Sequence, residues 1–313
     1  MYTKFFGLTK KPFSLIPDPS LLYLSAKHKK ALTALQYGLA SHAGFTVITG
    51  EIGSGKTTLV RSLLENIKDQ CEIGLITNTH SAFGDLLTWI LAAFHIRSSA
   101  TNKAERFQAF VDFITEINEA GKRVILIVDE AQNMDIQTLE ELRLLSNINI
   151  NQEIMLQLVL VGQPELVDKL NQPELIQFSQ RISIEYHLNP LNFEETEQYI
   201  HYRLKAAGCV ERIFQPSACA ALFYYSGGTP RLINNLADLA LVFSFAADKK
   251  KIEWKTIVDV ICERTTGGIK RFEDKVCLSP DMLKKPEETE KLRRAIIQET
   301  AIDIFKQTEK SKK

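Results

Sequence analysis

The chain has 313 residues, enough for one large domain and a smaller one or for two modest domains. With 45% hydrophobic and 24% charged residues, its composition is typical of a globular protein. Its 38 basic and 38 acidic residues give a formal net charge of +0, which excludes a strong overall attraction to nucleic acid or anionic lipid but permits a local basic patch. The five cysteines are widely spaced without a CxxC pair, which argues against a disulfide framework and a zinc site.

The sequence predicts no segment that crosses a membrane. Residues 1–13 lack the uninterrupted apolar core of a signal peptide. The longest apolar run, which starts at Leu239, has about half of the roughly 20 residues that a spanning helix needs. We therefore expect a cytoplasmic protein, attached to the inner membrane only through a partner.

Residues 1–40 are expected to form an N-terminal segment that packs on the domain after it, an α/β core over residues 41–190. Short apolar runs alternate there with stretches of helical period: FTVIT, EIGLIT, VILIVDE, MLQLVLVG and ISIEYHL. The runs are rich in Val, Ile and Leu and are mostly continuous, which is typical of strands buried on both faces. The pattern predicts a parallel sheet with helices between its strands.

After Pro190, stretches of helical spacing end at Gly, Pro or Asp, so residues 191–265 are predicted to form a small all-helical domain. Residues 266–313 read as an irregular linker and a charged amphipathic tail helix. The tail's mostly apolar stripe consists of Leu292, Ala295, Ile296, Glu299, Ile302 and Phe305. This stripe either contacts a partner or another copy, or stabilises the fold itself.

The stretch GEIGSGKT, residues 50–57, fits the GxxxxGK[ST] pattern and lies between a predicted strand and a predicted helix, as a phosphate-binding loop requires. Glycines let backbone N–H groups turn toward phosphate, the lysine adds a charge and the threonine offers a hydroxyl to Mg²⁺. The alternative is a glycine-rich turn without function. The nucleotide-binding residues expected here are Gly50, Glu51, Ile52, Gly53, Ser54, Gly55, Lys56, Thr57 and Thr58.

The run VILIVDEAQ ends a predicted buried strand with Asp129 and Glu130. Such a pair can hold Mg²⁺ with one carboxylate and polarise an attacking water with the next. The alternative is an acidic pair that caps a helix. Further polar residues stand at Asn78 and Gln163, which end predicted strands, at Arg181, which opens one, and at Arg231, which begins a helix. Each could instead be a cap or a surface group, with Arg181 paired to Glu185.

Together these motifs resemble those of the secretion-pathway A-protein (ExeA/GspA-type) AAA+ ATPases over residues 1–265. The matching stretches are FFGLTKKPFSLIPDP, LYLS with His28, GFTVITGEIGSGKTTLVRSLL, VILIVDEAQNM, EELRLLSNI, LQLVLVGQPEL, QRISIEYHLNPL and GGTPRLINNLADLAL. Similar modules occur beside exosortase and exopolysaccharide systems and in ATP-dependent regulators of transposition. The resemblance implies a P-loop AAA+ core with a helical lid, and an ATP hydrolase that uses Mg²⁺ and self-associates.

Carried over residue by residue, the resemblance gives each polar residue a role. The implied roles are Walker A for Lys56 and Thr57, Mg²⁺ ligand for Asp129, catalytic carboxylate for Glu130, polar switch for Asn78, sensor 1 for Gln163, arginine finger for Arg181 and sensor 2 for Arg231. A finger supplied by a neighbouring subunit implies that an isolated subunit hydrolyses ATP poorly. Assembly would then switch hydrolysis on.

The sequence departs from the family pattern in two places. Many AAA+ proteins have Asn, Ser or Thr where this chain has Gln163. The secretion proteins typically continue into a membrane helix and a periplasmic peptidoglycan-binding domain where this sequence has a charged tail, so anchoring and wall binding are not carried over. The N-terminal segment is expected to act as an adenine-side lid or subunit bridge, or simply to pack on the sheet, through Pro17, Pro19, Tyr23 and His28.

Three functions are compatible with these motifs. The first is an ATP-driven motor or switch that remodels a protein partner in a secretion, envelope or exopolysaccharide export system. The second is a DNA-bound regulator of transposition, for which Lys249, Lys250 and Lys251, or the terminal Lys310, Lys312 and Lys313, would supply a basic patch. The third is a nucleotide-gated scaffold with negligible hydrolysis, against which the catalytic carboxylate Glu130 argues.

Overall fold

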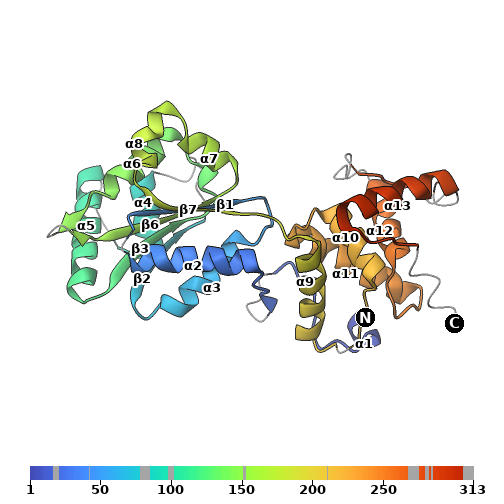
Figure 1. Cartoon of the computed structure of the whole chain (residues 1–313). Coiled ribbons are helices and arrows are strands. Elements are labelled where there is room, and N and C mark those ends of the chain that lie inside the picture. The colour runs from blue at the N-terminus through green and yellow to red at the C-terminus, as the bar shows by residue number, and fades with distance from the viewer. Residues whose placement is uncertain are drawn as a thin grey trace. The chain divides into compact units, whose positions relative to one another are not determined.

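The computed structural model describes residues 1–16, 21–41, 43–77, 85–97, 102–150, 153–209, 211–266, 275–278, 282 and 285–305. The chain divides into two compact units, which are described here one at a time (Figure 1). The sheet unit is Ala26–Asn189, and the helical unit combines Met1–Ser25 with Pro190–Lys313. In the described part of the chain, no helix is long and apolar enough to cross a membrane.

The sheet unit contains the parallel sheet that the apolar runs predict. Its strand order is β2-β3-β6-β1-β7, and neighbouring strands are parallel throughout. The strands are β1 (Phe45–Gly50), β2 (Cys71–Ile76), β3 (Arg123–Val128), β6 (Leu156–Gly162) and β7 (Ile182–Leu188). Val128 lies opposite Leu160, and Thr49 lies opposite Gly162, so the carboxyl ends of β3, β6 and β1 share one edge of the sheet. The α/β fold class is therefore confirmed.

Burial along the strands follows their place in the sheet. The central strands β1 and β6 are buried at every residue, and β3 is buried after its first, because helices cover both faces of a parallel sheet. In the edge strand β7, exposed residues alternate with partly buried ones up to the buried Leu188. This explains why ISIEYHL alternates while the other runs are continuous.

Helices flank the sheet, with α2 and α3 on one side and α6, α7 and α8 on the other (Figure 1). Asp85, Asn102 and Asp135 cap α4, α5 and α6, each accepting a hydrogen bond from the backbone N–H three residues on. The bounds are α2 (Ala26–Ala40), α3 (Lys56–Ile67), α4 (Leu86–Ala93), α5 (Lys103–Glu119), α6 (Ile136–Leu145), α7 (Glu165–Leu170) and α8 (Ile176–Ser179). Two 3₁₀ turns, η3 (Ala131–Asn133) and η4 (Pro173–Leu175), and a small hairpin, β4 (Asn149–Ile150) with β5 (Glu153–Ile154), complete the described elements. The sequence did not predict this hairpin.

The helical unit is built around α10, which is buried along most of its length. Its helices are α1 (Tyr2–Phe5), α9 (Phe193–Ala206), α10 (Pro216–Ser226), α11 (Pro230–Ala246), α12 (Trp254–Thr266) and α13 (Pro286–Thr300). Helices α9, α11, α12 and α13 all contact α10. The tail helix α13 contributes Leu292 and Ile296, both fully buried, to the same core. The apolar stripe of the tail therefore stabilises the fold, which is one of the two alternatives that the sequence left open.

Hydrogen bonds join the N-terminal residues to α9 within the helical unit. The buried guanidinium of Arg203 donates to the carbonyl oxygens of Pro12 at 2.6 Å and Ser14 at 3.1 Å. The Tyr23 hydroxyl donates to Gln198 at 2.8 Å. A buried arginine with several donors in a fixed fork can hold more than one carbonyl of an irregular segment. Within the segment 1–40, residues from Ala26 onward belong to the sheet unit and Met1–Ser25 to the helical unit, and the packing of residues 1–40 on the core stays a prediction.

Candidate nucleotide-binding site

The loop between β1 and α3 adopts a conformation that requires its glycines. Gly53 and Gly55 have φ of 81° and 102°, in the left-handed region that other residues avoid. A Cβ at Gly50 would lie 2.6 Å from the carbonyl oxygen of Leu188, so the neighbouring strand also requires glycine there. With glycine at these positions, the loop backbone can turn around a ligand that lies at the N-terminus of α3.

Lys56 is the first residue of α3, and its side chain folds back over the loop. Only 6% of the residue is exposed, and its Nζ donates to the carbonyl oxygens of Gly50 at 2.7 Å and Glu51 at 3.0 Å. Burial lowers the pKa of Lys56, although the carboxylates of Glu130 and Asp129 oppose this shift. A buried cation above a turn of backbone N–H groups is suited to bind phosphate.

Ser54 gives a direct test of whether the loop fits a phosphate ligand. Its residue is 1% exposed, and its Oγ has no hydrogen-bond partner among the residues that the structure describes. Buried hydroxyls without a partner are uncommon and call for a ligand or an ordered water. The loop residues present therefore fit a bound phosphate group.

Thr57 and Asp129 bring the loop and the end of β3 together. The Thr57 Oγ1 donates to Asp129 Oδ2 at 2.8 Å, and Asp129 is 7% exposed. The second oxygen, Oδ1, accepts from the backbone N–H of Glu130 at 3.0 Å. A hydroxyl and a carboxylate in contact at the end of a phosphate loop are a donor set for Mg²⁺.

Glu130 stands in an unusual backbone position, with φ of 55°, and two amide side chains hold its carboxylate. Glu130 Oε2 accepts from Gln132 Nε2 at 2.7 Å and from Gln163 Nε2 at 3.1 Å. Burial alone would raise the pKa of Glu130, but these hydrogen bonds and the charge of Lys56 lower it below its ordinary value. The carboxylate is thus held ionised, as a general base must be.

Gln132 is a residue of this site that the sequence reasoning missed. Its Oε1 accepts from the backbone N–H of Gln163 at 3.1 Å, which fixes the amide so that its nitrogen faces Glu130. The Nζ of Lys169 donates to the Gln132 carbonyl oxygen at 2.6 Å and also to that of Met134. The one available signal was a polar residue two positions after Glu130 in DEAQ.

His28 contacts the phosphate loop. This buried residue lies near the start of α2, and its Nε2 is 3.2 Å from the carbonyl oxygen of Ser54. A Cβ at Gly55 would lie 3.1 Å from the same nitrogen. His28 therefore packs against the loop and supports it. Of the other residues expected to act with it, Tyr23 belongs to the helical unit. Pro17 and Pro19 lie outside the described residues.

The remaining predicted site residues lie in different places. Gln163 reaches Glu130, as described above. Arg181 is exposed, and its Nη1 donates to Ser146 Oγ at 3.0 Å and to Asn147 Oδ1. Arg231 is an exposed residue in the first turn of α11, in the helical unit. Asn78 lies outside the described residues, and its role stays a prediction.

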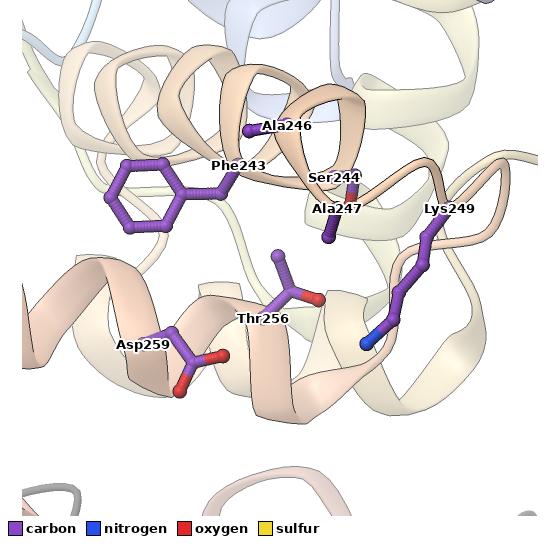
Figure 2. A pocket seen from close by; sticks show the side chains of 7 residues that line it. All are labelled: Phe243, Ser244, Ala246, Ala247, Lys249, Thr256 and Asp259. Atoms are coloured by element: carbon purple, nitrogen blue, oxygen red, sulfur yellow. The ribbon is translucent and has the colours of Figure 1, made fainter.

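The helical unit has a separate hollow of about 400 Å³ between α11 and α12. Figure 2 shows side chains that line this hollow, with Phe243 on α11, Lys249 just after it, and Thr256 and Asp259 on α12. Lys250 lies with its Nζ 5.9 Å from the ring centre of Phe5. Two of the lysines expected as a basic patch thus have neighbours within their own unit, and the terminal Lys310, Lys312 and Lys313 lie outside the described residues.

Residues 39–170 match the family model of an AAA domain. General secretion pathway protein A of Aeromonas hydrophila is 44% identical over 253 residues, which are 80% of this chain and 46% of that protein. The chain belongs to the secretion-pathway A-protein family of AAA ATPases. It spans about half the length of this family member.

Solved structures share the fold at low identity. Cdc6p of Pyrobaculum aerophilum is 16% identical and superposes with a TM-score of 0.61 over 82% of this chain and 70% of that one. The ORC2 protein of Aeropyrum pernix, solved as ADPNP and ADP complexes, is 14% identical, with a TM-score of 0.59 over 95% of this chain and 86% of that one. These similarities establish the AAA-type fold, and they agree with the parallel sheet and helical unit described above.

Proposed function

We propose that this protein binds ATP with Mg²⁺ at residues Gly50 to Thr58 and hydrolyses it. The observation that supports this most is the convergence of Thr57, Asp129 and Glu130 within one hydrogen-bonded group at the edge where β1, β3 and β6 end. Ligands of parallel α/β sheets bind outside the carboxyl ends of the strands. Membership of an AAA ATPase family supports the same proposal.

Each residue of the site would have a separate task. Backbone N–H groups of the loop, the Ser54 hydroxyl and the Lys56 ammonium would bind phosphate oxygens, the last after leaving the carbonyls of Gly50 and Glu51. Thr57 and Asp129 would hold Mg²⁺, which when bound neutralises charge on the phosphates. Glu130 would accept a proton from the attacking water, since the two amides keep its carboxylate ionised and oriented.

Two arginines would complete the site through assembly. Arg181 is exposed, and Ser146 and Asn147 hold its guanidinium at the end of α6. An exposed arginine with a fixed orientation is suited to bind phosphate of a neighbouring subunit in two places. We propose that Arg181 acts in this way and that Arg231 contacts nucleotide bound to its own subunit, so that ATP-dependent self-association controls the rate.

The energy of hydrolysis would be used on a protein partner in an envelope export system, with the chain attached to the inner membrane through that partner. The name of the Aeromonas hydrophila relative places that protein in a secretion pathway, and this supports the proposal. The DNA-bound function is less favoured, because the carboxylate of Asp259 lines the same hollow as Lys249 and interacts with its charge, which offsets part of a basic patch there. The scaffold function is less favoured because the two amides hold Glu130 in the ionised form that hydrolysis needs.

The experiment is the ATPase rate as a function of protein concentration, with and without duplex DNA, at two salt concentrations. We expect a rate per subunit that rises with concentration, ignores DNA and falls about 1000-fold in Glu130→Gln and in Arg181→Ala. Arg97→Ala, which removes another exposed arginine of the sheet unit, is the matched control and should leave the rate unchanged.

Other outcomes would change the proposal. A DNA-stimulated and salt-sensitive rate would favour the transposition regulator. A rate that is indifferent to both concentration and Arg181 would contradict the finger in trans. Tight ATP binding with no hydrolysis under any condition would favour the nucleotide-gated scaffold.

A further inference from the structure

Three side chains with metal-binding atoms meet in the helical unit, on α9 and α10. Glu197 and His201 lie four residues apart on α9, and Cys219 lies in the first turns of α10. One carboxylate oxygen, one imidazole nitrogen and the sulfur all lie within 4.8 Å of one another. The Glu197 and His201 side chains are 30% and 34% exposed, while Cys219 is fully buried. The group is therefore closed on the sulfur side and reachable from solvent on the other.

The spacing of the two α9 side chains agrees with a shared ion. Their nearest atoms, His201 Nε2 and Glu197 Oε1, are 3.8 Å apart, which is too long for a hydrogen bond. Two such atoms bound to one tetrahedral Zn²⁺ would lie about 3.4 Å apart, and nitrogen and sulfur about 3.6 Å apart. The separations of the three ligand atoms, at most 4.8 Å, thus exceed those that one ion requires by no more than about 1.2 Å.

The kinds of atom indicate which ion. Mg²⁺ and Ca²⁺ prefer all-oxygen ligands, whereas imidazole and thiolate ligands favour Zn²⁺ and its neighbours in the first transition row. Three protein ligands leave one position of a tetrahedron for water. No CxxC pair is needed, because two residues four apart on a helix supply the other ligands from one face.

We propose that Glu197, His201 and Cys219 form a binding site for a divalent transition-metal ion of the Zn²⁺ class. The ion joins α9 to α10 and so stabilises the helical unit. Binding removes the proton of the Cys219 thiol, and affinity therefore rises with pH.

Arg212 provides a further test of the site, because it pairs with the proposed ligand Glu197. Its guanidinium forms an ion pair with Glu197 Oε1, and its side chain is 48% exposed. Exposed ion pairs contribute little, about 0–1 kcal/mol, so a divalent ion can displace the arginine. Arg212 is thus a competitor for the carboxylate, and its removal must strengthen metal binding.

The test uses the full chain, stripped of metal and free of nucleotide, titrated with Co²⁺ as a spectroscopic probe for Zn²⁺. We expect tetrahedral ligand-field bands and a thiolate-to-cobalt charge-transfer band, both removed by Zn²⁺. Cys219→Ala should abolish the charge-transfer band. Cys277→Ala is the matched control, since Cys277 is a more exposed thiol of the same unit, where adventitious Co²⁺ would bind first.

The Zn²⁺ affinities of two further variants distinguish the loss of a ligand from a folding defect. His201→Ala should weaken Zn²⁺ binding by about 100-fold or more. Arg212→Ala should tighten it by about 2- to 5-fold, which is the range that an exposed ion pair of up to about 1 kcal/mol allows. A gain of affinity cannot arise from misfolding. Absence of the charge-transfer band, its persistence in Cys219→Ala, or an unchanged affinity in Arg212→Ala would overturn the site. Because no ATP is present, these outcomes are independent of the proposed ATPase activity.

Discussion

At the scale of single residues, Glu130 is the group on which the proposed hydrolysis depends, and its neighbours set its charge. Gln132 and Gln163 both donate to the same carboxylate oxygen, and together with Lys56 they lower the pKa of Glu130 against the effect of burial. A base with a lowered pKa is active down to lower pH, because it loses its charge only below that pKa. The amides therefore extend the working range of the site toward acid.

Gln132→Leu should shift this range. The hydrogen bond from Gln132 stabilises the charged form of Glu130, so its loss should raise the pKa of Glu130. We expect the acid limb of the kcat–pH profile to move to higher pH. Gln177→Leu, at an exposed position of α8, is the control. A uniform fall in kcat with an unmoved acid limb would mean that Gln132 acts in some other way.

Asp129→Asn should uncouple nucleotide binding from Mg²⁺. The carboxylate in contact with Thr57 would hold the ion, and an amide is a weaker ligand for a hard cation. We expect Mg²⁺ to tighten ATP binding by about 10-fold or more in the unmodified protein and hardly at all in Asp129→Asn. The measurement is the Kd for ATP in Mg²⁺ and in EDTA. An equal effect of Mg²⁺ in both proteins would show that Asp129 is not the ligand.

The contrast between Lys56 and Gln132 shows what sequence can predict about such a site. Lys56, Thr57, Asp129 and Glu130 were predicted because each stands in a local pattern, a glycine loop or the end of an apolar strand. Gln132 belongs to the site because η3 lies beside the end of β6, where the backbone N–H of Gln163 donates to Gln132. That proximity depends on how distant segments fold together, so the sequence pattern did not show it.

At the scale of elements, burial decides how readily each one is recognised from sequence. Strands β1, β3 and β6 were predicted because they are continuous apolar runs buried on both faces. The β4–β5 hairpin pairs only two residues on each side and gives no such signal. The stripe on α13 was seen, but its neighbour α10 could not be inferred, since an apolar helix face carries no information about what covers it.

Ile296→Ala tests the assignment of α13 to the core. Ile296 is fully buried, so its truncation should lower the free energy of unfolding by about 2–5 kcal/mol. Arg294→Ala, on the same helix with an 80% exposed side chain, should change it by less than about 0.5 kcal/mol. Urea unfolding of the full chain measures both. If Ile296→Ala instead weakened self-association without loss of stability, the tail would be an interaction helix.

At the scale of the whole molecule, the motifs identify an AAA ATPase, while the partner stays a proposal. The loop, the acidic strand end and the helical unit are shared across this fold. They indicate nucleotide chemistry but do not identify the partner on which the protein acts. Residues that act between subunits are also hidden from the sequence of one chain. Arg181 was noted as a polar residue at the start of a strand, but its role as an arginine finger came only from the family resemblance. The structure adds that Ser146 and Asn147 hold it.

Mixing two inactive variants tests whether Arg181 acts between subunits. Arg181→Ala keeps Glu130, and Glu130→Gln keeps Arg181, so an interface that pairs the first variant's site with the second variant's arginine is complete. In a random equimolar mixture of a symmetric homo-oligomer, about a quarter of the interfaces have this composition. We expect the mixture to recover a comparable fraction of the original ATPase rate, although each variant alone is inactive.

A mixture of Glu130→Gln with Lys56→Ala is the matched control for that recovery. Both of these proteins keep Arg181, but neither has a site that can both bind ATP and activate water, so no arrangement of the two restores a complete interface. Recovery in the first mixture alone requires that the arginine of one chain serve the nucleotide of another. Failure of both mixtures, with each variant still folded and the unmodified protein still assembling, would place Arg181 in its own subunit's site or in a structural role.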